Sequence, residues 1–304
     1  MKIGVIGLGG IAQKAYLPTY SKMQDQAEFI FATRNQEVQT KLQNSYNLKT
    51  MKNNLQEVLA EKIDACFIHT ATASHYELIK ACLLHDVHVF VDKPISENLE
   101  QVHELQQLAK ERNKLLMVGF NRRFAPMVEK LKQLTDKRMI FLQKNRAYSI
   151  QPTAFEIFDV FLHLVDTAVY LLDDPILQIK STIRETQGNM ETALLQLETA
   201  TTTAILTMDL KSGANRESYQ VNCLQGTYMV DDLVTFKSLE GDDECLQTFG
   251  DWTNTLEKRG FEQQVRQFLH AVQTGDRADL RQENIAKSHE ICQEMLRQLE
   301  ESGN

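Results

Sequence analysis

Two polar residues four positions apart lie in one of the most apolar stretches of the chain. Residues 157–172 read IFDVFLHLVDTAVYLL, and Asp159 and His163 stand four positions apart within them. On a helix this spacing places both side chains on one face. Histidine has an ordinary pKa near neutrality, so it can take a proton from a substrate hydroxyl and return it. The alternative is a structural pair whose polar groups are satisfied at a domain interface.

A lysine stands at a second position suited to this chemistry. Lys93 follows the strand predicted at VHVFVD, residues 87–92. An ammonium beside a reacting hydroxyl stabilises the negative charge that develops on its oxygen. The carboxyl end of a parallel strand is also where open α/β sheets bind their ligands. We therefore expect Lys93, Asp159 and His163 to be the catalytic residues.

The start of the chain carries the most specific binding motif. The run Gly7-Leu8-Gly9-Gly10-Ile11-Ala12 follows a short apolar strand pattern and precedes a helical one. Between a strand and a helix, G-x-G-x-x-A gives a tight turn, a bare backbone that a diphosphate can approach, and close helix–strand packing. The diphosphate then lies at the helix N-terminus. The alternative is a structural glycine turn that binds nothing.

The end of the second predicted strand, EFIFAT at residues 28–33, indicates which dinucleotide binds. An NAD site usually has Asp or Glu at this point. Here the strand ends in Thr33, and Arg34 follows. A hydroxyl and a guanidinium bind a 2′-phosphate that a carboxylate would repel. This favours NADP over NAD; the alternative is that Arg34 lies over the adenine or points to solvent.

Residues after the next predicted strand complete the expected cofactor site. Thr70, Ala71 and Thr72 end or follow DACFIHT, residues 64–70, and are expected at the adenine–ribose edge. His75 begins a helical pattern. Its ring either touches the cofactor or has a structural role.

Three polar residues follow the last strand of the first half, KLLMVGF at residues 114–120. Asn121 is expected near the nicotinamide, as a cofactor contact. Arg122 and Arg123 either bind a phosphate or an anionic substrate, or form salt bridges between domains.

The elements that position these residues change in kind near Phe120. Before it, strands alternate with helices, which indicates βαβ units and a parallel sheet. After it, β-rich segments indicate an antiparallel sheet, and two helices follow. The predicted segments are strands at 201–211, 217–224 and 227–238 and helices at 259–275 and 282–300.

Composition excludes several classes of protein. The 304 residues carry a net charge of -8 and show no basic cluster, which argues against nucleic-acid binding. The five cysteines are scattered and form no C-x-x-C pair, so we expect neither disulfides nor a metal site, and a reducing cytoplasm. No stretch approaches the roughly 20 apolar residues of a membrane span.

Four stretches together resemble the Gfo/Idh/MocA oxidoreductases, and within them the MviM-type subgroup. They are GVIGLGGIAQKAYLP, HTATASHYELIKACLLHDVHVFVDKPIS, GFNRRFAP and DVFLHLVD, in this order. The resemblance implies an α/β fold, with an N-terminal Rossmann domain at residues 1–119 and a C-terminal α+β domain at 120–304 built on a large, mostly antiparallel open sheet. It implies hydride transfer between a nicotinamide cofactor and an alcohol or carbonyl of a sugar- or polyol-like molecule. It also implies a homodimer that pairs through the C-terminal sheet.

The resemblance extends to single residues of the first domain. The E-K-P motif of the family appears here as Asp92-Lys93-Pro94. Lys93 then contacts the substrate hydroxyl and the nicotinamide ribose, and Asp92 supplies a carboxylate near that ribose. The bond between Lys93 and Pro94 is a candidate cis peptide.

The family's D-x-G-x-H motif spans Asp159 to His163, with Phe161 where many members have glycine. His163 matches the catalytic acid/base, and Asp159 matches the residue that binds a sugar hydroxyl. A ring at Phe161 could fill part of the pocket. Two alternative functions therefore stay open. One is a cofactor-binding sensor without turnover, and the other is a redox-neutral lyase or hydrolase that retains its nicotinamide cofactor.

Overall fold

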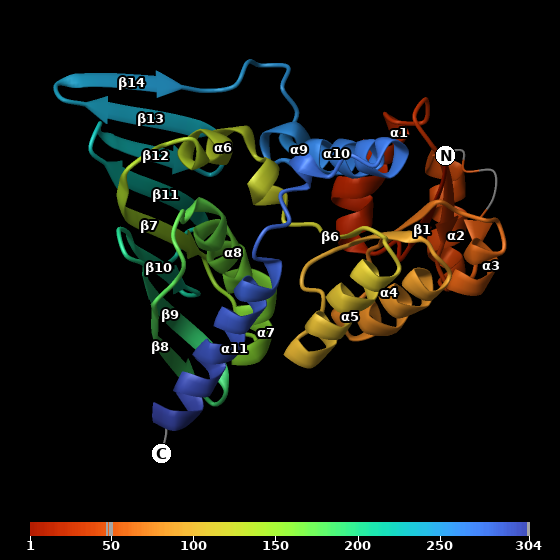
Figure 1. The fold of residues 1–304 in the computed structure, drawn as a ribbon, viewed down its shortest axis with the longest axis horizontal. Coiled ribbons are helices and arrows are strands. Elements are labelled where there is room, and N and C mark those ends of the chain that lie inside the picture. Colours follow the sequence, from red (N-terminus) through yellow and green to blue (C-terminus); the bar gives the residue numbers. More distant parts are fainter. Residues whose placement is uncertain (47, 49–50, 303–304) are drawn as a thin grey trace. The chain divides into compact units, whose positions relative to one another are not determined.

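The computed structural model describes residues 1–46, 48 and 51–302, and its chain divides into two compact units (Figure 1). Unit 1 comprises Met1–Gly119 and Phe261–Gln282, and unit 2 comprises Phe120–Gly260 and Glu283–Asn304. The chain passes from unit 1 to unit 2 between residues 119 and 120, at the domain boundary expected from the sequence. The return of Phe261–Gln282 to unit 1 differs from the expected single C-terminal domain.

Aromatic packing explains why this late segment belongs to unit 1. It contains α10 (Phe261–Thr274), an amphipathic helix. Phe268 of α10 meets Phe67 and Phe90 edge to face, with ring centroids 5.1 and 5.6 Å apart. The apolar face of α10 is therefore buried on the Rossmann core, a partner that no local sequence pattern identifies.

Unit 1 contains a six-stranded parallel sheet with the order β3-β2-β1-β4-β5-β6. This is the strand order of a dinucleotide-binding Rossmann fold, as expected. The strands are β1 (Lys2–Ile6), β2 (Glu28–Ala32), β3 (Met51–Lys52), β4 (Ala65–Ile68), β5 (His88–Val91) and β6 (Leu116–Val118). Its helices include a π-helical segment (Ala12–Tyr16), α1 (Leu17–Ser21), α2 (Gln36–Tyr46), α3 (Leu55–Leu59), α4 (His75–Leu84) and α5 (Leu99–Glu111).

Strand burial in unit 1 explains why the sequence predicted this sheet. The central strand β4, ACFI, is fully buried, and β1 and β5 are buried except at their first residue. Short continuous apolar runs are typical of parallel strands that are covered on both faces. Asn54 and Asn98 accept hydrogen bonds from the first turns of α3 and α5, which fixes where those helices begin.

Unit 2 contains an eight-stranded sheet with the order β14-β13-β12-β11-β7-β10-β9-β8. All neighbours pair antiparallel except β7 and β10, which confirms the expected open sheet. The strands are β7 (Lys137–Asn145), β8 (Gln178–Thr186), β9 (Asn189–Glu198), β10 (Thr203–Asp209), β11 (Arg216–Cys223), β12 (Thr227–Asp231), β13 (Thr235–Glu240) and β14 (Asp243–Gln247).

Helices gather on one side of this sheet (Figure 1). They are α6 (Pro126–Lys132), α7 (Thr153–Glu156), a π-helical segment (Ile157–Phe161), α8 (Leu162–Leu171) and α11 (Ile285–Ser302); a short helix, α9 (Thr255–Lys258), precedes the return to unit 1. Of these, α8 packs against β7 and β10, in the middle of the sheet. The helix with the predicted catalytic pair therefore lies over the centre of unit 2.

One predicted strand is wrong in extent. Residues 227–238 form two strands, β12 and β13, rather than one. Asp232 and Leu233 between them have φ of 50° and 64°, so the chain reverses there in a tight hairpin. Neither residue is a glycine, and the turn therefore carries no strong sequence signal.

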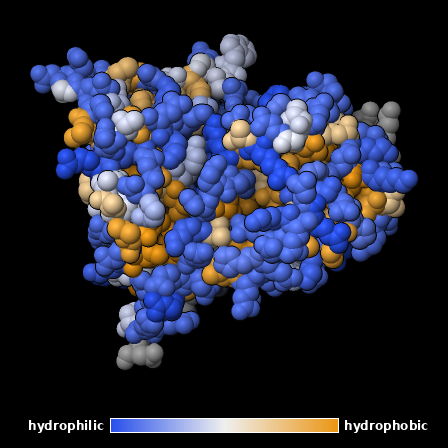
Figure 2. Space-filling view, in the orientation of Figure 1, coloured by the Kyte–Doolittle hydropathy of each residue, from blue (hydrophilic) through white to orange (hydrophobic). Residues whose placement is uncertain are grey.

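Among the described residues, none of the helices is both long and apolar enough to cross a membrane. On the face that Figure 2 shows, hydrophilic side chains predominate and apolar groups lie between them in small patches.

Candidate active site

The glycine turn begins at the carboxyl end of β1. Gly7 has a φ of +89°, which L side chains rarely adopt. A Cβ at Gly7 would lie 2.7 Å from the carbonyl carbon of His69 and from the amide nitrogen of Thr70. The Gly7 amide donates to the carbonyl of Ala32, at 3.1 Å. Gly7 is therefore required by the close approach of the ends of β4 and β2.

Gly9 and Gly10 differ from Gly7, because a Cβ on either would meet no atom within 4 Å. The helical segment starts here, with the Gln13 amide donating to the Gly9 carbonyl at 3.0 Å. Ile11 is exposed, and Ala12 is buried against the sheet. Open space beside bare backbone at a helix start fits the diphosphate of a dinucleotide.

Thr33 and Arg34 lie where the sequence predicted them, directly after β2. Thr33 is half-buried, and its amide donates to the Lys52 carbonyl at 3.1 Å. Arg34 is exposed. A second cation, Lys41 of α2, lies 3.4 Å from Oε1 of Gln13 in the helix after the glycine turn. Lys41 was not predicted, because only the packing of α2 brings it near that turn.

Residues after β4 form a hydrogen-bonded loop. The Thr70 hydroxyl accepts from Oγ of Ser74 at 2.8 Å, whereas Ala71 is exposed and Thr72 is half-buried. His75 is buried, with Nδ1 2.8 Å from the Pro94 carbonyl and Nε2 3.1 Å from the Thr70 carbonyl. Burial lowers the pKa of His75, although both carbonyls oppose this. Both ring nitrogens face backbone, which supports the structural alternative for His75.

A polar network that was not predicted surrounds Asp92 at the end of β5. The Tyr16 hydroxyl donates to Oδ1 of Asp92 at 3.1 Å, and Nε2 of Gln264 donates to that hydroxyl at 3.2 Å. On the other side, Nδ1 of His69 lies 3.7 Å from Oδ2 of Asp92. The Tyr20 hydroxyl lies 2.7 Å from Nε2 of His69. The carboxylate thus accepts a hydrogen bond from Tyr16 on one side, and the His69 ring lies beyond hydrogen-bond distance on the other.

The protonation states in this network follow from burial. Burial, and then the charge of Asp92, raise the pKa of Tyr16 and of Tyr20 well above the usual value, so both phenols keep their protons. Tyr20 and Nε2 of His69 share a hydrogen bond, and the other ring nitrogen of His69, Nδ1, faces Asp92. The Tyr16 ring stacks on His69 with centroids 3.9 Å apart, which fixes the imidazole plane.

Lys93 follows Asp92 directly and is half-buried. The bond between Lys93 and Pro94 is cis, as expected. The side chains of Asp92 and Lys93 therefore both leave the chain at the carboxyl edge of the parallel sheet, next to the loop that follows β4.

Asp159 and His163, the predicted pair in unit 2, are more exposed to solvent than the residues around them. Between residues 156 and 169, Asp159 and His163 are partly exposed and every other residue is buried. Asp159 lies in the π-helical segment, a local widening that is frequent at functional sites. Phe161 is fully buried, so its ring belongs to the core of unit 2. Between residues 156 and 169, these two polar side chains are thus the ones that solvent reaches.

The candidates Asn121, Arg122 and Arg123 are buried, and their side chains form hydrogen bonds inside unit 2. Arg122 binds Glu217 through two hydrogen bonds of 2.5 and 2.9 Å, and Arg123 binds Asp166 through two of 2.9 and 2.7 Å. Asn121 accepts from Nη1 of Arg122 and is 3% exposed. Asn121 is thus hydrogen-bonded inside unit 2, and its contact with the cofactor stays a prediction. The structure supports salt bridges for both arginines, but within one unit.

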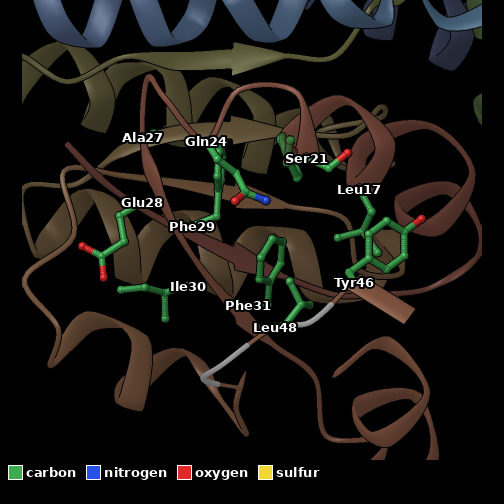
Figure 3. Close-up of a pocket in the computed structure, with 11 residues that line it drawn as sticks. Leu17, Ser21, Gln24, Ala27, Glu28, Phe29, Ile30, Phe31, Tyr46 and Leu48 are labelled. Atoms are coloured by element: carbon green, nitrogen blue, oxygen red, sulfur yellow. The ribbon is translucent and has the colours of Figure 1, made fainter. Parts of the chain in front are cut away.

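A hollow of about 560 Å³ lies elsewhere on unit 1, beside β2. Figure 3 shows Phe29, Phe31 and Tyr46 among the side chains that line it. None of the candidate residues lines this hollow, so we assign it no part in the site. Within the described part of the chain, no three His, Cys, Asp or Glu residues are grouped so that they could hold a metal ion.

Comparison with known proteins agrees with this arrangement. Residues 1–120 match a family model described as oxidoreductase family, NAD-binding Rossmann fold, and residues 126–241 match a YceM-like C-terminal domain. A putative oxidoreductase, YceM, from Salmonella typhimurium is 33% identical over 277 residues, which cover 90% of each chain. The solved structure of a dehydrogenase (MviM) from Clostridium difficile has a TM-score of 0.92 and 30% identity, over 98% of this chain and 99% of that one. A myo-inositol 2-dehydrogenase from Thermotoga maritima is 28% identical over 141 residues, 46% of this chain and 42% of that protein.

Proposed function

Since the chain belongs to the Gfo/Idh/MocA family of oxidoreductases, we propose that it is an NADP(H)-dependent dehydrogenase acting on a sugar- or polyol-like molecule. The observation that carries the proposal is the partly exposed pair Asp159 and His163 on an otherwise buried helical stretch. The relative named as a myo-inositol 2-dehydrogenase supports a polyhydroxylated substrate.

The proposed chemistry divides among three side chains. When bound, the nicotinamide ring supplies the hydride acceptor or donor. His163 takes the proton of the reacting hydroxyl during oxidation and returns it during reduction. The Lys93 ammonium stabilises the charge on the reacting oxygen, and Asp159 accepts a hydrogen bond from a neighbouring hydroxyl and so orients the substrate.

The network around Asp92 would position the cofactor. Tyr16 donates a hydrogen bond to the carboxylate at the end of β5, and the His69 ring packs beside it, with Nδ1 3.7 Å from Oδ2. A carboxylate fixed in this way can accept hydrogen bonds from ribose hydroxyls without first losing conformational freedom. Tyr16 and His69 are therefore positioning residues, which act through Asp92.

The proposed NADP preference rests on Thr33, Arg34 and Lys41. Parallel titrations of NADPH and NADH, followed by fluorescence, test it. We expect NADPH to bind more tightly, and Arg34→Glu to weaken NADPH binding at least about tenfold with little effect on NADH. Lys62→Glu is the matched control, because Lys62 is exposed just before β4, at the amino edge of the sheet. Tighter binding of NADH by the unmodified protein would contradict this preference.

The catalytic role of His163 is tested by turnover of a panel of polyols, sugars, sugar acids and sugar phosphates with NADP. We expect His163→Ala to reduce turnover by about 100-fold or more, with NADPH affinity unchanged. His270→Ala is the control, since His270 is exposed on α10. Tight NADPH binding with no turnover of any panel member would favour the sensor alternative.

We also propose that two copies pair through the face of the unit 2 sheet opposite its helices. Phe141 of β7 and Leu194 of β9 are 38% and 41% exposed there, on strands that have a neighbour on both sides. Apolar side chains at such positions favour burial against a partner. Light scattering should give a dimer at micromolar concentration, and Phe141→Glu should shift it toward monomer, whereas Leu177→Glu, just before β8 at the edge of the sheet, should not.

A further inference from the structure

A buried cluster in unit 2 contains more positive than negative charge. Glu217 of β11 is its central carboxylate and is contacted by three basic side chains. Arg122 binds it through both carboxylate oxygens, Nζ of Lys144 lies 2.5 Å from Oε2, and Nη2 of Arg259 lies 3.8 Å from Oε2. The Tyr219 hydroxyl donates to Oε1. Two of the three cations, those of Arg122 and Lys144, are almost fully buried.

The single carboxylate cannot balance this charge. The bidentate hydrogen bonds of Arg122 already neutralise the charge of Glu217. Burial, and then the charge of Arg122, lower the pKa of Lys144 to about 7. The same two causes lower the pKa of Arg259, although Glu217, Tyr219 and the exposed Asp232 oppose them. Arg122 is paired through two hydrogen bonds, whereas the Arg259 guanidinium stays 3.8 Å from Glu217, so this end of the cluster can receive an added anion.

Arg259 is the part of the cluster that a ligand can reach. Its side chain is 34% exposed, and among the described residues its guanidinium meets no hydrogen-bond acceptor within bonding distance. Its backbone is fixed, because Nδ2 of Asn121 donates to its carbonyl at 2.7 Å. The next residue, Gly260, has a φ of +79°, and a Cβ there would lie 2.2 Å from the Asn121 carbonyl oxygen. A rigid backbone thus positions the planar guanidinium of Arg259, whose N–H groups can donate hydrogen bonds to a ligand.

We propose that Arg259, supported by Arg122 and Lys144, binds an anionic group of the substrate, either a carboxylate or a phosphate. The substrate is then a sugar acid or a sugar phosphate rather than a neutral polyol. This inference rests on the proposed function, in which unit 2 binds the substrate. A guanidinium suits both anions, because its parallel N–H groups match two oxygens of either one.

Calorimetric titration at constant ionic strength tests the proposal, with and without NADPH. The probes are D-gluconate, glucose 6-phosphate and neutral myo-inositol. We expect at least one anion to bind about tenfold or more tightly than myo-inositol, and the preferred anion identifies the group. Arg259→Gln should weaken that binding about tenfold, and Arg259→Lys should restore part of it. Arg216→Gln is the matched control, since Arg216 is an exposed arginine on the opposite face of β11.

The outcomes separate this proposal from the dehydrogenase assignment. Equal binding of neutral and anionic probes, an Arg259→Gln variant that binds like the unmodified protein, or an equal loss in Arg216→Gln overturns the anion site. If NADPH binds and no anion does, the anion site alone fails. If an anion binds through Arg259 and NADPH does not bind, the proposed dehydrogenase function fails and the anion site stands.

Discussion

Two glycines of one turn should respond in opposite ways to the same substitution. Gly7→Ala places a side chain on a residue with φ of +89° and a Cβ 2.7 Å from the backbone of His69 and Thr70. The left-handed conformation alone costs about 1–2 kcal/mol, and the contact with rigid backbone adds to it. We expect a loss of at least about 2 kcal/mol, which lowers the unfolding temperature of unit 1 by roughly 4–8 °C.

Gly9→Ala meets no atom within 4 Å, so it should leave the unfolding temperature unchanged or slightly raised. Its methyl group occupies the space through which a diphosphate approaches the backbone, so NADPH should bind at least about tenfold more weakly. Thermal unfolding followed by circular dichroism, and NADPH titration of the same samples, measure both effects. A Gly9→Ala variant that binds NADPH normally would refute the assignment of the turn as a diphosphate site. A Gly7→Ala variant of full stability would refute the packing argument.

Three further substitutions test the two units separately. Arg123→Met leaves Asp166 buried without its partner and should cost about 3–5 kcal/mol in urea unfolding. Because the pKa of Lys144 falls from 10.5 to about 7 on folding, the unfolded chain holds an extra proton between these values, so stability should rise with pH there. Lys144→Met should remove this rise, which unfolding midpoints at neutral and alkaline pH would show; an unchanged rise contradicts the shift. Tyr16→Phe removes one hydrogen bond to Asp92 and should weaken NADPH binding about fivefold without loss of fold.

Local patterns predicted the Rossmann sheet because its strands are short, continuous apolar runs that alternate with helices. They failed where the signal is not local. The hairpin at Asp232 and Leu233 uses positive φ without glycine, and β8, which was not predicted, has none of its residues fully buried. The return of α10 to unit 1 depends on ring contacts with strands about 200 positions earlier, such as that of Phe268 with Phe67.

In the candidate site, too, local patterns predicted some features and missed others. The partial exposure of Asp159 and His163 was predictable, because a polar pair at helical spacing contrasts with an apolar helix. The roles of Arg122 and Asn121 were not, because their partners lie far along the chain, as Glu217 does, 95 positions from Arg122. From sequence alone, Arg122 and Arg123 could either bind a ligand or form salt bridges. The salt bridges could be identified only once the positions of the carboxylates were known.

The network around Asp92 could have been predicted in part, from the same rule that located the other candidates. In a parallel sheet, the first residue after each central strand lies at the ligand-binding edge. That rule selects Gly7 after β1, Thr33 after β2 and Asp92 after β5, and by the same count it selects His69 after β4. What it cannot supply is the partner of each residue. Tyr16 reaches Asp92 from the π-helical segment that follows the glycine turn, so the segment that would receive the diphosphate also holds the carboxylate beside Lys93. Cofactor binding and the orientation of the proposed catalytic edge therefore depend on one short helix.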